Sequence, residues 1–121
     1  MKHKDYVNLL FDRASSAIAL TSGPKHDEYG RSADTLENWK VQARILGCAP
    51  EEALRGCWAK HIYSTFRIIE EAAKYGIVPD RAYLNEKMND MHNYLFLLEA
   101  LIEDRRKDIE PYQAESDVPK G

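Results

Sequence analysis

The chain has 121 residues, of which 44% are hydrophobic and 31% charged, and a formal net charge of −3 at pH 7. This length supports one compact domain with its own core and is too short for two. The near balance of acidic and basic residues excludes the strongly basic surface of a general nucleic-acid-binding protein. We therefore expect a single domain without general affinity for nucleic acids.

No segment has the composition of a membrane span, and the N-terminus lacks the uninterrupted apolar core of a secretory signal. Cys48 and Cys57 are nine positions apart and belong to no CxxC pair or His/Cys cluster at zinc-finger spacing. These features predict a cytoplasmic protein that has two reduced thiols and no contact with a membrane.

Two shorter helices are predicted in the N-terminal half. The first covers about residues 4–21, where apolar residues recur at helical spacing until Gly23 and Pro24 interrupt the pattern. The second begins near an N-cap at Asp34 and ends at Gly47. Its apolar stripe consists of Leu36, Trp39, Ala43 and Leu46.

Two longer helices are predicted in the C-terminal half. One begins at Pro50, a residue suited to the first helical turn, and runs to Gly76. The other has Asp80 as its N-cap and continues to about Asp108. We expect an all-α, single-domain four-helix bundle over residues 1–109, followed by a flexible C-terminal tail at 110–121.

The last predicted helix carries two apolar stripes. The first follows a four-three-four-three-four spacing and is expected to be the main core face. It consists of Leu84, Met88, Met91, Leu95, Leu98 and Ile102. The second is apolar only in its C-terminal half and consists of Tyr83, Glu86, Asp90, Asn93, Tyr94, Leu97 and Leu101.

Glu86 and Asp90 are therefore neighbours at i,i+4 beside a surface that the helix buries further along. Two close carboxylates repel each other unless a cation or a proton lies between them, and Mg²⁺ is a common biological solution. The alternatives are that both point into solvent or that both pair with Lys or Arg. As a metal site, the pair is expected to take Glu28 as a third candidate ligand.

The third predicted helix places His61 in the middle of its apolar stripe. A histidine there is either a packed core residue or a catalytic group. Lys60 and Arg67 share the flank of that stripe with Ser64 and Glu71. The two basic residues could bind a phosphate, or they could form a solvated face with a salt bridge to Glu71.

The segment "KHDEYGRS" concentrates polar and aromatic residues before Gly30. Tyr29 in this loop can stack on a flat ring. Trp39 has a stripe position that favours core packing, with base stacking as the second possibility.

These segments together resemble small helical phage and prophage proteins of uncharacterised function. Their pattern is an amphipathic helix, a tyrosine-glycine loop, an Asn-aromatic pair, a long middle helix and a last helix of the form acidic-x-x-x-Asp-x-x-(Gly/Asn)-Tyr-x-x-Leu. The resemblance covers about residues 5–103. It rests on "HDEYG", on "LENW" with Asn38 and Trp39, and on Glu86, Asp90, Asn93, Tyr94 and Leu97.

This pattern is in turn similar to a reduced form of the MazG-like all-α NTP pyrophosphohydrolases and of helical domains associated with phage nucleotide modification. The resemblance implies acidic residues that bind Mg²⁺ while water attacks the α-phosphate of a nucleoside triphosphate. Glu86 and Asp90 match the later metal-binding helix, but they are four positions apart where that family has three. The family's earlier EExxE motif is represented only by "EEALR", which ends in Arg55.

Two functional hypotheses follow. The first is a phage-type nucleotide-binding protein, with hydrolysis by Glu86, Asp90 and His61 as a further expectation. Its expected substrate-binding residues are Tyr29, Trp39, Lys60, Arg67, Asn93 and Tyr94. The second is a non-enzymatic interaction protein that sequesters a signalling nucleotide or inhibits a host protein. The apolar surface of the last helix favours a homodimer or a partner protein in either case.

Overall fold

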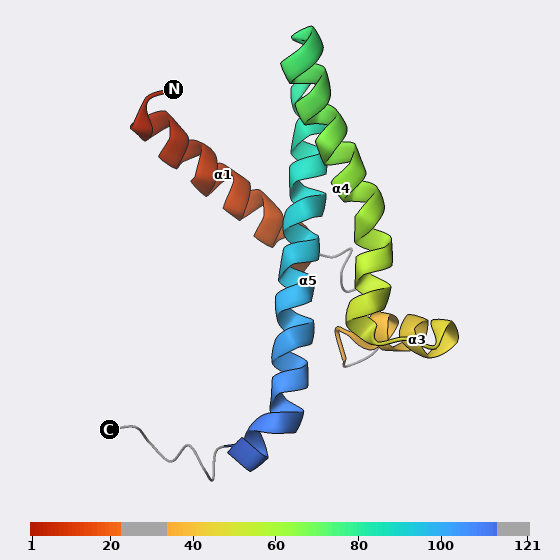
Figure 1. Cartoon of the computed structure of the whole chain (residues 1–121). Helices are drawn as coiled ribbons and strands as arrows, with labels where there is room; N and C mark the ends of the chain where they lie inside the picture. Colours follow the sequence, from red (N-terminus) through yellow and green to blue (C-terminus); the bar gives the residue numbers. More distant parts are fainter. Residues whose placement is uncertain (23–33, 114–121) are drawn as a thin grey trace.

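The computed structural model describes the backbone of residues 1–22 and 34–113 (Figure 1). Within these ranges the chain forms four helices and no strand, which confirms the all-α class. The helices are α1 (His3–Ser22), α3 (Glu37–Leu46), α4 (Pro50–Tyr75) and α5 (Arg81–Gln113). None of these described helices combines the length and apolar character needed to cross a membrane.

The two aspartates predicted as N-caps behave differently in the structure. Asp80 caps α5, because its carboxylate accepts a 2.8 Å hydrogen bond from the backbone N–H of Tyr83. Asp34 is not the N-cap of α3, which begins only at Glu37 with Leu36 as its N-cap. The Asp34 carboxylate instead accepts a 2.9 Å hydrogen bond from the backbone N–H of Leu36 in the preceding turn. The predicted starts are therefore correct to within three residues.

Glycine ends α3 and α4 as predicted. Gly47 and Gly76 adopt left-handed conformations with φ of 67° and 63°, which glycine reaches without steric cost. The end of α5 differs from the prediction, because the helix continues to Gln113. The first four residues of the predicted tail, 110–113, are thus helical, and Pro111 does not stop the helix at the residue before it.

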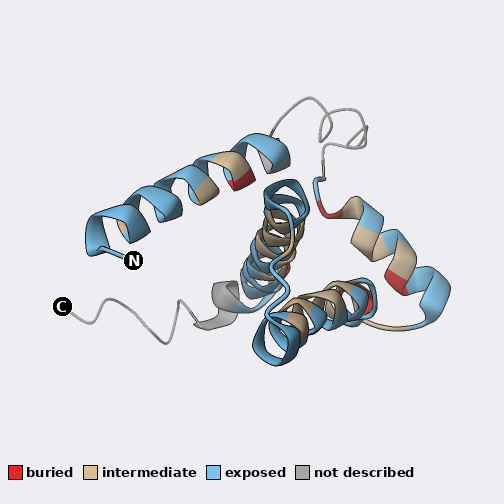
Figure 2. Cartoon of the chain, turned by 90° about the horizontal axis from the view of Figure 1, so that it is seen from above, coloured by how far each residue is buried: buried red, intermediate tan, exposed pale blue. Residues whose placement is uncertain are grey.

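Helices α4 and α5 form a long antiparallel hairpin (Figure 1). Helix α3 packs against α4, while α1 packs against α5 on the side away from α4 (Figure 2). The α5 helix consequently lies between α1 and α4. Among the described helices, the backbone of α1 comes close only to that of α5.

The core lies where α3, α4 and α5 meet. It consists of Leu36, Leu54 and Leu101, one residue from the start of α3 and one from each long helix. Leu54 is the most completely buried of them, with 1% of its surface exposed. Partly buried Trp39, Tyr94, Leu97 and Leu98 pack around these three.

The expectation that the stripe from Leu84 to Ile102 forms the main core face is only partly correct: Leu98 packs against the core, but other members of the stripe are exposed. Leu95 and Ile102 on this stripe are 48% and 39% exposed, whereas Leu101 on the neighbouring stripe is 3% exposed. The reason is that the hydrophobic cluster lies on the Tyr94 and Leu101 side of α5. The four-three spacing identified an apolar face correctly, but the core covers only part of that face.

The attachment of α1 to α5 is mainly polar. The Arg13 guanidinium donates hydrogen bonds of 3.2 Å to the Asn85 carbonyl and 3.1 Å to the Asn89 side chain. Asn89 in turn donates a 3.1 Å bond to the Ser16 hydroxyl. Ala17 is the buried apolar contact of this helix, at 1% exposure.

Candidate functional site

His61 of α4 faces Asp90 of α5 in the middle of the hairpin. The His61 Nδ1 atom lies 3.6 Å from a carboxylate oxygen of Asp90. This distance exceeds a hydrogen bond, and Nδ1 is buried without a hydrogen-bond partner among the described residues. The structure thus brings together two of the three predicted catalytic residues. A small movement of either side chain would bring Nδ1 and the carboxylate within hydrogen-bond distance.

Two stacked aromatic rings lie beside His61. The Tyr94 ring lies 5.0 Å from the His61 ring and is stacked on Trp58, with centroids 5.9 Å apart and planes inclined by 8°. Burial raises the pKa of the Tyr94 hydroxyl, and the charges of Cys57 and Asp90 raise it further. Because Trp58 covers its ring, Tyr94 takes part in the packing of α4 against α5.

The basic residues of α4 lie on its exposed flank. An Arg67 nitrogen is 3.3 Å from a Glu71 oxygen, which is the salt bridge that the sequence offered as an alternative. The Arg67 and Glu71 side chains are 62% and 40% exposed, so a ligand phosphate can compete for this guanidinium. Lys60 is also exposed; it directly precedes His61 on α4 and therefore points to a different side of the helix.

Arg67 borders a surface depression of about 360 Å³ at the end of the hairpin where α4 leads into α5. Two tyrosines, Tyr63 and Tyr83, stand in its wall. Sequence reasoning did not assign either of them to a site, although Tyr83 lies on the same stripe as Glu86 and Asp90. The complete lining is Tyr63, Ser64, Arg67, Ile68, Glu71, Pro79, Asp80 and Tyr83.

Glu86 follows one turn after Tyr83, and Asp90 follows one turn after that. Glu86 is exposed and makes no hydrogen bond or ion pair with any residue that the structure describes. Within residues 1–22 and 34–113, no three His, Cys, Asp or Glu side chains are grouped closely enough to hold a metal ion. Two carboxylates alone do not form a closed metal site. Mg²⁺ bound by one or two carboxylates completes its coordination with water and substrate phosphates.

The other predicted binding residues fall in different places. Trp39 packs against the leucine core. Asn93 is half-buried on α5, between Asp90 and the core residue Leu97. Glu28 and Tyr29 lie outside the described residues.

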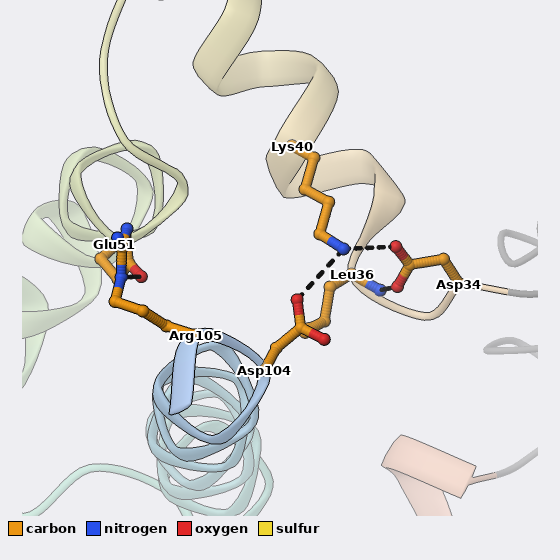
Figure 3. Close-up of polar contacts among 6 residues, drawn as sticks. All are labelled: Asp34, Leu36, Lys40, Glu51, Asp104 and Arg105. Atoms are coloured by element: carbon orange, nitrogen blue, oxygen red, sulfur yellow. Dashed lines mark hydrogen bonds and ion pairs between the residues drawn. The ribbon is translucent and has the colours of Figure 1, made fainter. Parts of the chain in front are cut away.

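A polar cluster that the sequence did not predict joins α3, α4 and α5 beside the core residue Leu36 (Figure 3). The Lys40 ammonium lies 2.6 Å from Asp34 and 3.1 Å from Asp104. On the other side of α5, the Arg105 guanidinium makes two 2.7 Å hydrogen bonds to Glu51. Lys40, Glu51, Asp104 and Arg105 border a cavity of about 330 Å³. Since each charge faces an opposite charge, we interpret this cluster as a clamp between helices.

The clamp makes stability depend on pH. Hydrogen bonding to Arg105 lowers the pKa of Glu51, so this stabilisation is present above about pH 4.3 and is lost as the pH falls through the lowered value. Hydrogen bonds to Asp34 and Asp104 raise the pKa of Lys40, so its contribution is present below about pH 10.4 and is lost as the pH rises through the raised value. The clamp therefore contributes fully between these limits.

We expect Arg105→Gln to lower the free energy of unfolding at pH 7. The effect should shrink progressively as the pH falls from about 4.3, the ordinary glutamate pKa, through the lowered pKa of Glu51 in the folded wild type. Urea denaturation between pH 3 and pH 8 measures this difference. Arg106→Gln is the matched control, because the Arg106 side chain is equally exposed, at 51%, but bonds Glu103 of the same helix. An equal loss in both variants at every pH would contradict the clamp.

Comparison with protein-family models, with curated proteins and with solved structures finds no match for this chain.

Proposed function

We propose that the chain binds a nucleotide at the end of the α4–α5 hairpin. The observation that carries this proposal is the depression that combines the Arg67 guanidinium with Tyr63 and Tyr83. A guanidinium recognises phosphate oxygens, and aromatic rings stack on nucleobases. The sequence analysis likewise predicted that Arg67 could bind a phosphate.

The acidic residues of α5 support a role for Mg²⁺ in this binding. Glu86 and Asp90 continue the stripe of Tyr83, so a phosphate chain that leaves the depression along α5 meets their carboxylates. Magnesium held there would bridge the carboxylates to the phosphates and offset their negative charges. His61 beside Asp90 then orients that carboxylate and can accept or donate a proton at Nδ1.

Isothermal titration with nucleoside triphosphates and cyclic nucleotides, with and without Mg²⁺, tests the proposal. We expect binding that strengthens with Mg²⁺ and that weakens at least tenfold in Arg67→Gln. Arg44→Gln is the matched control: Arg44 is also about two-thirds exposed and makes the same 3.3 Å ion pair with a glutamate of its own helix.

The outcomes separate the alternatives. Pyrophosphate release in the same mixtures would extend the proposal to a pyrophosphohydrolase, whereas binding without turnover indicates a protein that sequesters or senses the nucleotide. No binding by the wild type, or equal losses in both arginine variants, would refute the proposed site.

A second candidate function is a non-enzymatic interaction protein of the kind that inhibits a host protein. The observation that favours it is the apolar surface of α1, where Phe11 and Ile18 are 70% and 57% exposed. If the titrations show no nucleotide binding, this surface is the first place to look for a protein partner.

A further inference from the structure

Part of the apolar α5 stripe that was expected to form the core lacks cover among the described residues. Leu95 and Ile102 remain 48% and 39% exposed, seven residues apart on one side of the helix. On α4, Phe66 and Ile69 are 63% and 59% exposed. Exposed aromatic and branched side chains in such a row are typical of an interaction surface.

Helical phase shows that both rows lie on the same face of the hairpin. Cys57 of α4 contacts Gln42 of α3 at 3.7 Å, and Phe66 follows nine residues later, which is two and a half turns. Asp104 of α5 contacts Lys40 of α3, and Leu95 precedes it by the same nine residues. Phe66 and Leu95 therefore both point away from α3. We call this surface, with Ile62, Phe66 and Ile69 of α4 and Met88, Leu95 and Ile102 of α5, the open face.

Helix α1 leaves most of the open face uncovered. Its bonds to α5 reach Asn85 and Asn89 near the start of that helix, and it makes no backbone approach to α4. In Figure 2, α1 and α3 lie on different sides of the hairpin, and neither of these two described helices lies on a third side. The open face thus belongs to the side of α4 and α5 that the described helices do not pack against.

We propose that a second copy of this chain docks on the open face, so that two α4–α5 hairpins pair into an intermolecular four-helix bundle. Apolar residues seven positions apart, as in Met88, Leu95 and Ile102, are the spacing by which long helices pack side by side. A surface made of two straight helices is complementary to itself about a two-fold axis. This inference does not depend on nucleotide binding.

The dimensions and charges of the open face fit this occupant. From Met88 to Ile102 the α5 part of the open face is about 21 Å long at 1.5 Å per residue, and two helices spaced about 10 Å apart give a width of about 20 Å. A corrugated surface of this size supplies a large part of the roughly 800 Å² that each partner buries in a standard interface. Some charges at its margins are paired within their own helices, as in Glu70 with Lys74 at 2.9 Å and Glu103 with Arg106 at 3.2 Å. These pairs reduce the charge that two copies would oppose.

Size-exclusion chromatography with light scattering, over a range of protein concentrations, measures the association. We expect the wild type to have twice the mass of the 13.9 kDa chain. Leu95→Arg and Phe66→Asp each introduce a charge into the open face and should weaken dimerisation at least tenfold. Ile45→Arg is the control, because Ile45 is 79% exposed on α3, away from the open face, and should leave the mass unchanged.

Circular dichroism of each variant distinguishes loss of association from loss of folding. The milder Leu95→Ala, which buries no charge, provides a second test of association. A helical variant that elutes as a monomer supports the proposal. A monomeric wild type at all concentrations would overturn it, as would a dimer that survives both open-face substitutions or that is dissociated only by Ile45→Arg.

Discussion

Replacing Leu54 with alanine is expected to lower the free energy of unfolding by about 3 kcal/mol, the usual cost of truncating a fully buried leucine. Leu54 is 1% exposed and contacts the core residues Leu36 and Leu101, so the cavity opens where three helices meet. The core of this chain contains few fully buried large side chains among the described residues, and other contacts can compensate little. Urea or thermal denaturation at a fixed protein concentration measures the loss.

Leu46→Ala is the control for this substitution. Leu46 is 66% exposed at the end of α3, and its truncation should change the free energy of unfolding by less than about 0.5 kcal/mol. Similar losses in both variants would show that the core is not centred on Leu54.

The helices of this chain could be located from sequence because local chemistry fixes their ends. Asp80 supplies an acceptor for an otherwise unpaired N–H at the start of α5, and Gly47 and Gly76 supply the left-handed residues that end α3 and α4. These effects act within a few residues, so a single sequence reveals them. The end of α5 was less well predicted, since one proline in the last turns does not prevent the helix from continuing.

The buried face of α5 could not be predicted in the same way. After Tyr94 both neighbouring stripes are apolar, and periodicity cannot tell which of them a distant helix will cover. Leu101 is buried because Leu36 and Leu54 reach it, and these residues are far away in the sequence. The same limit applies to the candidate site: the Arg67 and Glu71 ion pair is local and was anticipated, whereas the approach of His61 to Asp90 and the Arg105 clamp depend on the pairing of α4 with α5.

Under the proposed function, Asp90→Asn is expected to weaken Mg²⁺-dependent nucleotide binding by at least tenfold while leaving the helical content unchanged. Asparagine keeps the shape and the position beside His61 but removes the negative charge that Mg²⁺ requires. Titration in the presence and absence of Mg²⁺ isolates this effect, because binding without the metal should be nearly the same in variant and wild type.

Asp104→Asn serves as the matched control for this experiment. The Asp104 side chain is 39% exposed and that of Asp90 is 38% exposed, but Asp104 bonds Lys40 in the clamp. It should weaken the fold through that contact and leave nucleotide affinity unchanged. If Asp90→Asn bound nucleotide as tightly as the wild type with Mg²⁺ present, the carboxylates of α5 would have no part in the site.

The attachment of α1 also determines how cooperatively the chain unfolds. Helices α3, α4 and α5 share one leucine cluster and the charged clamp, so none of them can leave without disrupting the others. Helix α1 shares neither and is held by hydrogen bonds from Arg13 and Asn89 and by the small side chain of Ala17. We therefore expect local opening of α1 to cost less free energy than global unfolding, so that α3, α4 and α5 unfold as one cooperative unit and α1 can open separately.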